Sequence, residues 1–400
     1  MTSPASIRRW RLPEGVDELL PPAARQLELM RRRVLDVFHA WGFEYVEPPV
    51  IEYLDSLLVG SGTDLDLQTL KAVDQRTGRL LGVRADMTSQ AARIDAHSLP
   101  GDGVQRLCYA GPVVHANPAA ALDTRVPYKA GAEIFGAASA AADAEVIALL
   151  LEVLRHGGVE TPVLVLGHMG IFHALTTSMG LTADVEQALF SAVQSKSETD
   201  VRELLGDRPG AELVASLPAL MGRREVLGEA RRLLAGAPAE AVRAIDALEA
   251  LADMVAVRVP GVTLRFDIAE LAGYGYHNGP VFSAFQAERG SALARGGRYD
   301  GIGAAFGRAR PATGFDVSLR ALLAATAAES AGAVWVPWVS GDGDRRRGLQ
   351  ATLAALRDAG DVVICALSPD EVPPARCDRM VSETDEGWKV QPLSANSQED

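Results

Sequence analysis

The spacing of apolar and polar residues predicts how the N-terminal part of the chain begins. Over Pro22–Trp41 the apolar residues recur at intervals of three and four, which is typical of an amphipathic helix, and Gly42 ends it. The run Phe43–Val46 follows as a strand. Because Pro48 and Pro49 cannot sit inside a central ladder, this strand either lies at the edge of a sheet or ends there.

Further strands are predicted where apolar and β-branched residues run between turn signals. Leu70–Val73 and Arg79–Arg84 flank the turn segment DQRTG and predict a β-hairpin. The helical pattern of Asp143–Arg155 ends at two glycines. The other predicted strands are Arg106–Val114, Ala130–Phe135, Thr161–Leu166, Val262–Phe266 and Val281–Phe285.

The pattern changes over residues 170–257, which are rich in Ala, Leu, Glu and Arg, have helical periodicity and carry almost no strand signal. We interpret this segment as a helical insertion. Beyond residue 325, the succession VWVPWV, LQATLAALRDAG and VVICAL predicts a small β–α–β unit. The final SANSQED is expected to be disordered.

Together these elements predict an α+β fold, with antiparallel strands and helices to one side of them. We divide the chain into residues 1–325, which contain the insertion, and a small C-terminal α/β domain over residues 326–400.

Composition narrows the class of protein. With 48% hydrophobic residues among 400, the chain is long enough for a large core and more than one domain. The net charge of −13 gives no global attraction for nucleic acid. Three cysteines without CxxC spacing argue against a disulfide framework and against a zinc site.

Targeting and cofactor signals are absent from the sequence. The basic N-terminus has no apolar core of a signal peptide behind it, and no apolar run reaches the roughly 18 residues that a membrane span needs. No GxGxxG follows a predicted strand, and there is no Walker sequence. We therefore expect a cytoplasmic protein without a metal or cofactor.

Eight segments, taken in their order, carry a resemblance to a known family. The segments are LPEGVDELLP, HAWGFEYVEPPVIEY, VRADMTSQAAR, YAGPVVHANP, RVPYKAGAEIFG, GYGYHNGPVF, ALARGGRYDGIG and ATGFDVSLRAL. The most specific piece is GGRYDG. Over residues 11–325 their succession resembles histidyl-tRNA synthetase, a class II synthetase, and this resemblance implies a class II antiparallel sheet flanked by helices.

The resemblance implies a pocket for a histidine-like ligand. Asp86, Thr88 and Glu133 fall where the synthetase receives the ammonium and imidazole of its amino acid. An ammonium needs such anionic acceptors, because burying it without partners costs several kcal/mol. Lys129 departs from the family pattern, in which an amide side chain is usual at this position.

The same resemblance implies the rest of the pocket wall. Tyr276, His277 and Tyr299 would surround the ring of the ligand. Arg298 and the paired glycines before it would let backbone and side chain close over the ligand.

The positions that hold ATP in the synthetase are not kept. Three arginine positions carry His115, Ala272 and Ala321, and an acidic position carries Asn117. Removing one preorganised transition-state donor typically costs ~3–4 kcal/mol, and a neutral histidine does not replace a guanidinium. We therefore expect no useful adenylation and assign no catalytic residue.

This combination resembles a second family, the regulatory subunits of ATP phosphoribosyltransferase. The C-terminal segment from residue 331 carries seven Lys/Arg and twelve Asp/Glu, the opposite of a tRNA-binding surface. The resemblance implies a short catalytic subunit as partner, feedback by histidine and a hetero-octamer of four chains of each kind. It also implies a homodimer through Phe38–Pro49.

Structural alternatives stand beside these site assignments. GGRYDG also fits a plain turn with a capping aspartate. Asp86 is equally suited to be the N-cap of a helix over Met87–Ile94, with Thr88 in its first turn, and both roles are compatible. Glu133 fits a solvated carboxylate at a strand end, and His277 fits a satisfied core histidine.

Two other functions remain as alternatives. One is an active histidyl-tRNA synthetase with unusual motifs, which would exchange pyrophosphate into ATP in the presence of histidine. The other is a free-standing histidine-binding sensor, which would keep histidine binding without any phosphoribosyltransferase partner.

Overall fold

The computed structural model describes residues 11–59, 63–99, 101–117, 123–271, 277–287, 290–325, 332–340 and 343–393. The chain divides into two compact units, Met1–Ala327 and Ala328–Asp400. The predicted disorder of SANSQED concerns residues outside the described ranges.

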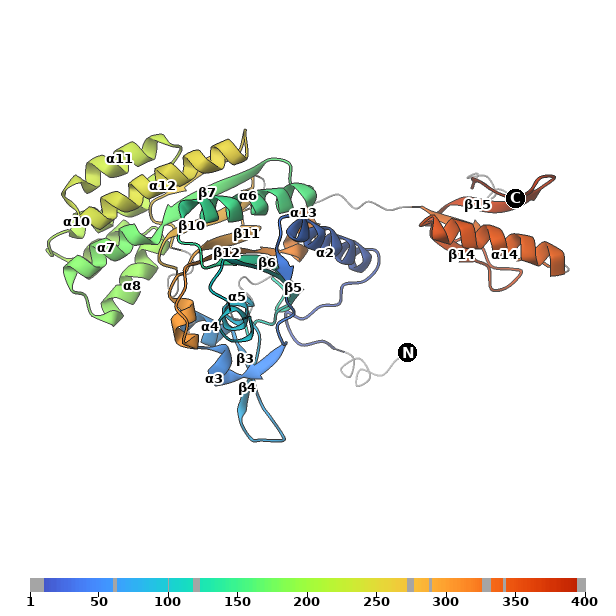
Figure 1. Ribbon diagram of the computed structural model, residues 1–400, viewed down its shortest axis with the longest axis horizontal. Coiled ribbons are helices and arrows are strands. Elements are labelled where there is room, and N and C mark those ends of the chain that lie inside the picture. Colours follow the sequence, from blue (N-terminus) through green and yellow to red (C-terminus); the bar gives the residue numbers. More distant parts are fainter. Residues whose placement is uncertain are drawn as a thin grey trace. The chain divides into compact units, whose positions relative to one another are not determined.

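The first unit is built on a mixed sheet, in which nine strands are found within the described residues (Figure 1). Their order is β1-β5-β6-β12-β11-β10-β7-β9-β8. The pairs β1/β5 and β7/β9 are parallel, and the other neighbours are antiparallel. The strands are β1 (Glu44–Tyr45), β5 (Gln105–Pro112), β6 (Tyr128–Phe135), β7 (Pro162–His168), β8 (Met221–Gly222), β9 (Thr263–Asp267), β10 (Pro280–Gln286), β11 (Ala294–Arg298) and β12 (Ala312–Ser318).

A smaller sheet, in the order β2-β4-β3, is joined to the first unit (Figure 1). It contains β2 (Ile51–Tyr53), β3 (Leu70–Val73) and β4 (Leu80–Val83). The antiparallel pairing of β3 with β4 confirms the predicted hairpin.

Helices of the first unit fall into those around the sheets and those of the insertion. Around the sheets lie α2 (Ala23–Ala40), α3 (Leu54–Leu57), α4 (Thr63–Gln68), α5 (Thr88–Arg93), the π-helical turn η2 (Ile94–Ser98), α6 (Ala140–His156), the 3-10 turn η5 (Ile302–Phe306) and α13 (Leu319–Ala325). The insertion contains α7 (Met169–Met179), α8 (Ala183–Gln194), α9 (Glu198–Leu205), α10 (Ala211–Ser216), η3 (Leu217–Ala219), α11 (Glu225–Leu233), η4 (Leu234–Gly236) and α12 (Ala239–Arg258).

The two faces of the central sheet differ in chemistry, because successive side chains of a strand point to opposite sides. On β6, Ala130, Ala132 and Ile134 are buried in the main hydrophobic core, which also contains the apolar faces of α2, α6 and α12. The alternate positions of β6, Lys129 and Glu133 among them, therefore belong to the other face. One face of the sheet packs in the main core, and the other carries a smaller hydrophobic cluster, which includes Phe135, beside the polar side chains of Lys129 and Glu133.

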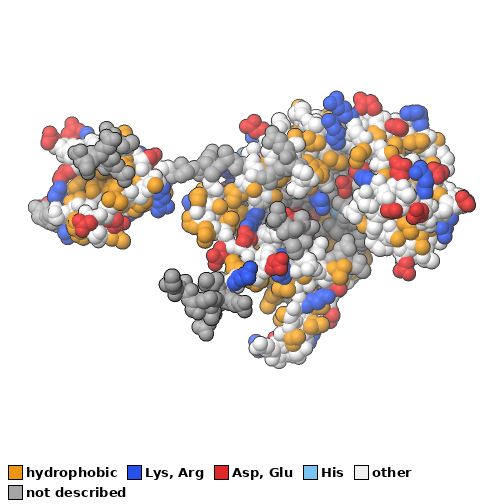
Figure 2. Space-filling view, turned by 180° about the vertical axis from the view of Figure 1, so that it is seen from behind, with side chains coloured by type: hydrophobic (Ala, Val, Ile, Leu, Met, Phe, Trp, Pro, Cys, Tyr) orange, Lys and Arg blue, Asp and Glu red, His pale blue; other side chains and the backbone are white. Residues whose placement is uncertain are grey.

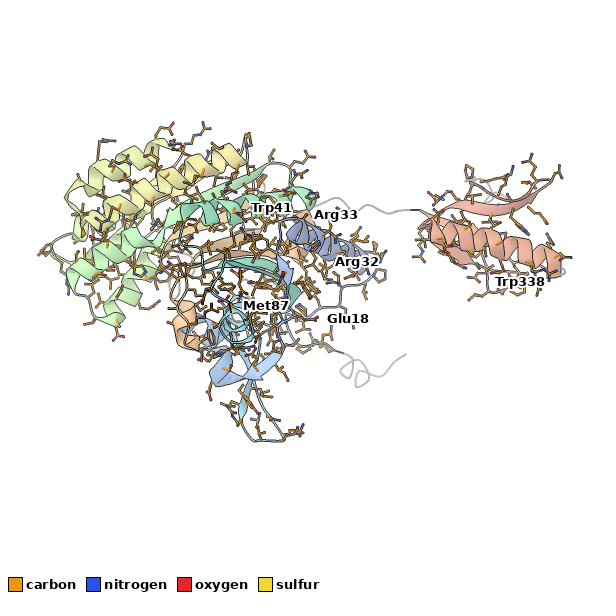
Figure 3. The ribbon with its side chains drawn as sticks, in the orientation of Figure 1. Glu18, Arg32, Arg33, Trp41, Met87 and Trp338 are labelled. Atoms are coloured by element: carbon orange, nitrogen blue, oxygen red, sulfur yellow. The ribbon has the colours of Figure 1, made fainter. Side chains whose placement is uncertain are left out.

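The second unit carries a four-stranded sheet in the order β14-β13-β15-β16, packed against one helix. The predicted β–α–β succession is present as β13, α14 and β14, and a hairpin follows it. Trp335 is buried, whereas Trp338 is 47% exposed and lies at the surface (Figure 3). The elements are β13 (Ala333–Val336), α14 (Gly343–Asp358), β14 (Val363–Cys365), β15 (Cys377–Thr384) and β16 (Gly387–Pro392).

Two central strands, β11 and β12, were not predicted from the pattern. The sequence of β11 is ARGGR, in which two glycines and two arginines indicate a loop by local propensity. Its five residues nevertheless pair with β12, and four of them also pair with β10. Tertiary pairing on both sides therefore overrides the local preference.

Gly314 of β12 lies where the polar face is tightly packed. A Cβ on Gly314 would overlap the carboxylate of Glu133, which is buried and cannot move away freely. We expect Gly314→Ala to lower the free energy of unfolding by about 1–3 kcal/mol, as for an overpacked core. Chemical denaturation of the purified chain measures this change.

Gly228→Ala is the matched control, because Gly228 is exposed on α11 and an added Cβ there meets nothing within 4 Å. In a helix, alanine is favoured over glycine by about 0.5–1 kcal/mol, so this variant should be slightly more stable than the wild type. Equal stability of the two variants would contradict the packing argument.

Candidate functional site

The polar face of the sheet is the candidate site, and glycines keep space on it. On β6, Gly131 lies between Lys129 and Glu133 and is paired with Tyr109 of β5 on one side and Asp316 of β12 on the other. A Cβ at Gly131 would overlap the phenol ring of Tyr109. The glycine therefore allows the phenol to lie across β6 toward Glu133.

Glu133 is the centre of this face and is only 1% exposed. Its two carboxylate oxygens accept hydrogen bonds from two phenols, from Tyr109 at 2.8 Å and from Tyr299 at 2.5 Å. The hydroxyl of Thr88, at the start of α5, lies 3.2 Å from that of Tyr109. The interpretation of Glu133 as a solvated strand-end carboxylate is therefore wrong.

Burial changes the protonation of this carboxyl group. Desolvation raises the pKa of Glu133 to about 8, and the hydrogen bonds from Tyr299 and Tyr109 oppose that rise. Desolvation likewise raises the pKa of Tyr109, which therefore stays a neutral donor. Near neutral pH the centre of the site thus has little negative charge.

A second cluster lies beside Glu133 and consists of one ammonium between two carboxylates. The Nζ atom of Lys129 lies 3.3 Å from Oδ2 of Asp86 and 3.1 Å from Oδ2 of Asp316. Asp86 also accepts a hydrogen bond of 2.6 Å from the backbone N–H of Thr88, the first residue of α5. The N-cap of α5 is Met87, so the expectation that Asp86 is the N-cap is wrong, although its carboxylate is bonded to the first residue of the helix and to the polar cluster at once.

The charges of this cluster depend on one another. Burial alone would raise the pKa of Asp86, but the nearby Lys129 ammonium and the Thr88 hydrogen bonds hold it below its ordinary value. Burial raises the pKa of Asp316, although Lys129 opposes the rise. The two carboxylates and the lysine therefore form one electrostatic unit.

The residues expected around the ring of a ligand are only partly brought together. The rings of His277 and Tyr299 lie 6.2 Å apart, and His277 is 7% exposed. A Cβ on Gly297 would come within 3.0 Å of the His277 ring. Tyr276 lies outside the described residues.

The position of Arg298 corrects the expectation that its side chain closes over a ligand. It precedes Tyr299 in the extended chain, so the two side chains point to opposite faces. The guanidinium binds Asp143 of α6 at 2.9 Å and the carbonyl oxygens of Ala137 and Ser139. Arg298 therefore attaches the sheet to the helical layer behind it.

The positions matched to the ATP arginines carry no replacement cation where they are described. The ring of His115 is bonded through Nε2 to the carbonyl of Ala85, and burial lowers its pKa, with the charge of Lys129 acting in the same direction. Ala321 on α13 packs against the hydrophobic core. Asn117 is exposed, and Ala272 lies outside the described residues.

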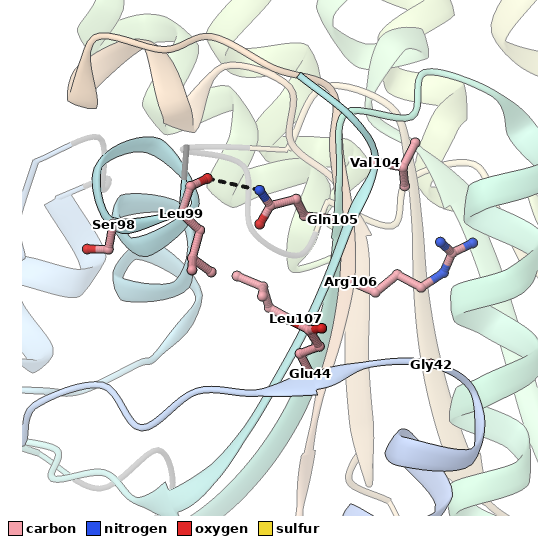
Figure 4. A pocket seen from close by; sticks show the side chains of 8 residues that line it. All are labelled: Gly42, Glu44, Ser98, Leu99, Val104, Gln105, Arg106 and Leu107. Atoms are coloured by element: carbon pink, nitrogen blue, oxygen red, sulfur yellow. Dashed lines mark hydrogen bonds between the residues drawn. The ribbon is translucent and has the colours of Figure 1, made fainter. Parts of the chain in front are cut away.

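A separate hollow of about 380 Å³ lies at the edge of the central sheet, between η2 and β5 (Figure 4). Gln105 donates to the carbonyl of Leu99 on its wall, and Arg106 pairs with Glu145. Among its lining residues only Glu44 and Arg106 are charged. It therefore lacks the convergent polar groups found around Glu133.

Other classes of site find no support in the part of the chain that the structure describes. There, no three His, Cys, Asp or Glu side chains are grouped so that they could hold a metal. No described helix has both the length and the apolar character to span a bilayer. On the face seen in Figure 2, acidic and basic side chains are interspersed over the insertion.

Sequence reasoning missed two members of the site, Tyr109 and Asp316. Both lie in segments that the resemblance had singled out, YAGPVVHANP and ATGFDVSLRAL. The signal for Tyr109 was an aromatic residue alternating with glycine on a predicted strand. The signal for Asp316 was a lone acid within an otherwise apolar strand.

Family models match both units of the chain. The family model for histidyl-tRNA synthetase matches residues 15–322, and that for the ATP phosphoribosyltransferase subunit HisZ C-terminal domain matches residues 331–391. A solved structure from Bacillus halodurans, described as an ATP phosphoribosyltransferase regulatory subunit/histidyl-tRNA synthetase, superposes with a TM-score of 0.77 at 26% identity, covering 89% of this chain and 92% of that one. Histidyl-tRNA synthetase from Nostoc sp. PCC 7120 superposes with a TM-score of 0.77 at 17% identity, and the match covers 96% of this chain and 95% of that one. At this identity the likeness shows only that the fold is shared.

The sheet, its polar face and these matches define a class II histidyl-tRNA synthetase-like protein with a distinct C-terminal domain. Relatives named ATP phosphoribosyltransferase regulatory subunit are 46% identical over 399 residues in Pseudomonas syringae pv. tomato and 47% identical over 397 residues in Pseudomonas aeruginosa. In both cases the match covers 98% of this chain and 100% of the relative. The chain belongs to the family of ATP phosphoribosyltransferase regulatory subunits.

The buried carboxyl group makes stability depend on pH. Because the pKa of Glu133 is raised from 4.5 to about 8 on folding, the folded chain holds this proton more tightly than the unfolded chain. Its contribution to stability is complete below about pH 4.5 and is lost as the pH rises through about 8. Glu133→Gln, which is neutral at every pH, should flatten this decline.

Unfolding of both proteins by urea at several pH values measures the effect. Between pH 4.5 and about 8, the free energy of unfolding of the wild type should fall by on the order of a few kcal/mol more than that of Glu133→Gln. Identical pH profiles of wild type and Glu133→Gln would show that Glu133 ionises normally and would contradict the assignment.

Proposed function

We propose that this chain is a non-catalytic regulatory subunit of ATP phosphoribosyltransferase, which carries out the first step of histidine biosynthesis. Its partner is then a short catalytic subunit that depends on this chain for activity and for feedback by histidine. The observation that carries the proposal is the 46% identity over 399 residues with a protein of that name, through both units. We place this function in the cytoplasm.

The chemistry of the site supports a binding role without catalysis. Adenylation builds charge on the α-phosphate of ATP, and fixed cations must meet that charge. At two of the matched positions the chain offers the His115 ring, bonded to a carbonyl, and the methyl group of Ala321. Neither can replace a guanidinium, so ATP would find no preorganised partner there.

We propose that the polar face around Glu133 is the place where histidine acts. Its phenols, carboxyl groups and the ring of His277 are the types of group that bind an ammonium and an imidazole. Histidine controls the complex if it binds one arrangement of the subunits better than the other. A coupling free energy of ~1–3 kcal/mol is enough for useful inhibition.

We also propose that two copies of this chain pair through Phe38–Pro49, within a hetero-octamer of four regulatory and four catalytic chains. The strand β1 lies at the edge of the central sheet, and its Tyr45 is 46% exposed. Val50 and Ile51, which follow this segment, are 48% and 56% exposed. An edge strand beside exposed apolar side chains is a surface suited to pairing.

Reconstitution tests the function directly. The purified chain should activate a short ATP phosphoribosyltransferase from the same cell and make it sensitive to histidine, as followed by formation of the phosphoribosyl-ATP product. The chain alone should show no histidine-dependent exchange of pyrophosphate into ATP. Exchange at a rate typical of a synthetase would favour that alternative, and histidine binding without any effect on the transferase would favour a free-standing sensor.

The pairing surface is tested by a charge at its centre. Tyr45→Glu should convert the dimer to a monomer, because the carboxylate would have to be buried without a partner. Sedimentation velocity on the chain without its catalytic partner measures this. Val257→Glu, at an 80% exposed site on α12, is the matched control and should leave the dimer intact. A dimer that survives Tyr45→Glu would move the interface elsewhere.

A further inference from the structure

A side chain of the protein itself, Lys129, already pairs with two carboxylates of the site. The Lys129 ammonium lies within 3.3 Å of Asp86 and 3.1 Å of Asp316. The three side chains come from β6, β12 and the segment before α5, so the tertiary structure brings the cluster together. The exposed fraction of the side chain is 18% for Lys129, 24% for Asp86 and 25% for Asp316, which places the cluster at the border between core and solvent.

The two carboxylates, Asp86 and Asp316, are positioned to bind a cation between them. Asp86 is oriented by the N–H of Thr88, and Asp316 is fixed by the ladder between β6 and β12. Two partly buried carboxylates this close repel each other unless a cation lies between them. The Lys129 ammonium is the cation bonded to both of them in the described structure.

Lys129 lies on the same face as Glu133, the centre of the site, with only Gly131 between them on that face. The ammonium of a bound amino acid would need an anionic acceptor on this face. Glu133 is a poor one near neutral pH, since burial raises its pKa to about 8. Among the residues described on this face, the two carboxylates that Lys129 holds are the acceptors that remain.

We propose that Lys129 is a specificity-determining residue whose ammonium holds the place of a ligand's ammonium. A zwitterionic ligand must displace Lys129 from Asp86 before its own amino group can bind. Lys129 thereby weakens the site for free amino acids, and it sets the concentration at which the site fills. This inference rests on the proposed function, in which histidine is the ligand of the polar face.

Lys129→Gln tests the inference, because it removes the ammonium and keeps most of the side-chain length. Calorimetric titration of the full-length chain with L-histidine should give a dissociation constant about tenfold lower than that of the wild type. Lys129→Arg, which keeps the charge, should bind as weakly as the wild type. Lys71→Gln removes the same charge from a surface pair with Asp66 and should change nothing.

The form of the ligand separates displacement from a general loosening of the site. L-Histidinol keeps the ammonium without a carboxylate, so Lys129→Gln should raise its affinity as much as that of histidine. Imidazole-4-propionate has no ammonium, so Lys129→Gln should leave its affinity unchanged or lower it, because the two carboxylates are then no longer paired with Lys129. Should Lys129→Gln fold poorly, the double variant Lys129→Gln with Asp316→Asn removes the repulsion and should still bind histidine about tenfold more tightly than wild type.

The outcomes distinguish this inference from the proposed function. Unchanged or weaker histidine binding by the folded Lys129→Gln and double variants overturns it, as does an equal gain for imidazole-4-propionate. If the reconstituted enzyme stays sensitive to histidine while these results are obtained, the inference fails and the proposed function stands. If the reconstituted enzyme does not respond to histidine but Lys129→Gln binds it more tightly, the proposed function fails and the role of Lys129 stands.

Discussion

The burial of one carboxyl group, that of Glu133, is the constraint on which the site depends. A carboxyl group removed from water must either be bonded or become neutral. Two phenols are bonded to the Glu133 carboxyl group, and desolvation raises its pKa to about 8. Both phenols donate to the ionised form, and in the protonated form Glu133 itself donates one of the two hydrogen bonds. This arrangement needs two glycines in the sheet, because Tyr109 needs Gly131 opposite it and Glu133 itself needs Gly314 as its neighbour. The glycines of the polar face follow from this one group.

The charges of the site explain why a synthetase-like fold serves regulation in this family. A catalytic site for adenylation needs cations that are free to meet phosphate. In the described part of this site, Lys129 is bonded to two carboxylates and Arg298 is bonded to Asp143 on the opposite side of the sheet. What remains is a set of hydrogen-bonding groups around a nearly neutral centre. The described residues of such a site offer no fixed cation free to stabilise a reacting triphosphate.

Fold and site were predictable from the sequence to different degrees. The helix α2, the hairpin β3–β4 and the β–α–β succession of the second unit followed from local periodicity, which reports whether one side of an element is buried. The strand β11 did not, because its glycines and arginines have no strand propensity and only its neighbours make it a strand. Asp86, Thr88, Glu133 and Tyr299 were found through motifs, while Arg298 was assigned to the wrong face.

The sequence by itself determined the class of fold, the near neutrality of the ATP positions and the family to which the motifs point, since these depend on residue type and order. The tertiary structure alone decided which groups meet. Lys129 contacts Asp86 and Asp316, which are 43 and 187 positions away in the chain, and Tyr299 reaches Glu133 over 166 positions. Local periodicity places a side chain on a face of its own strand, but only the register between distant strands decides which charge lies opposite it.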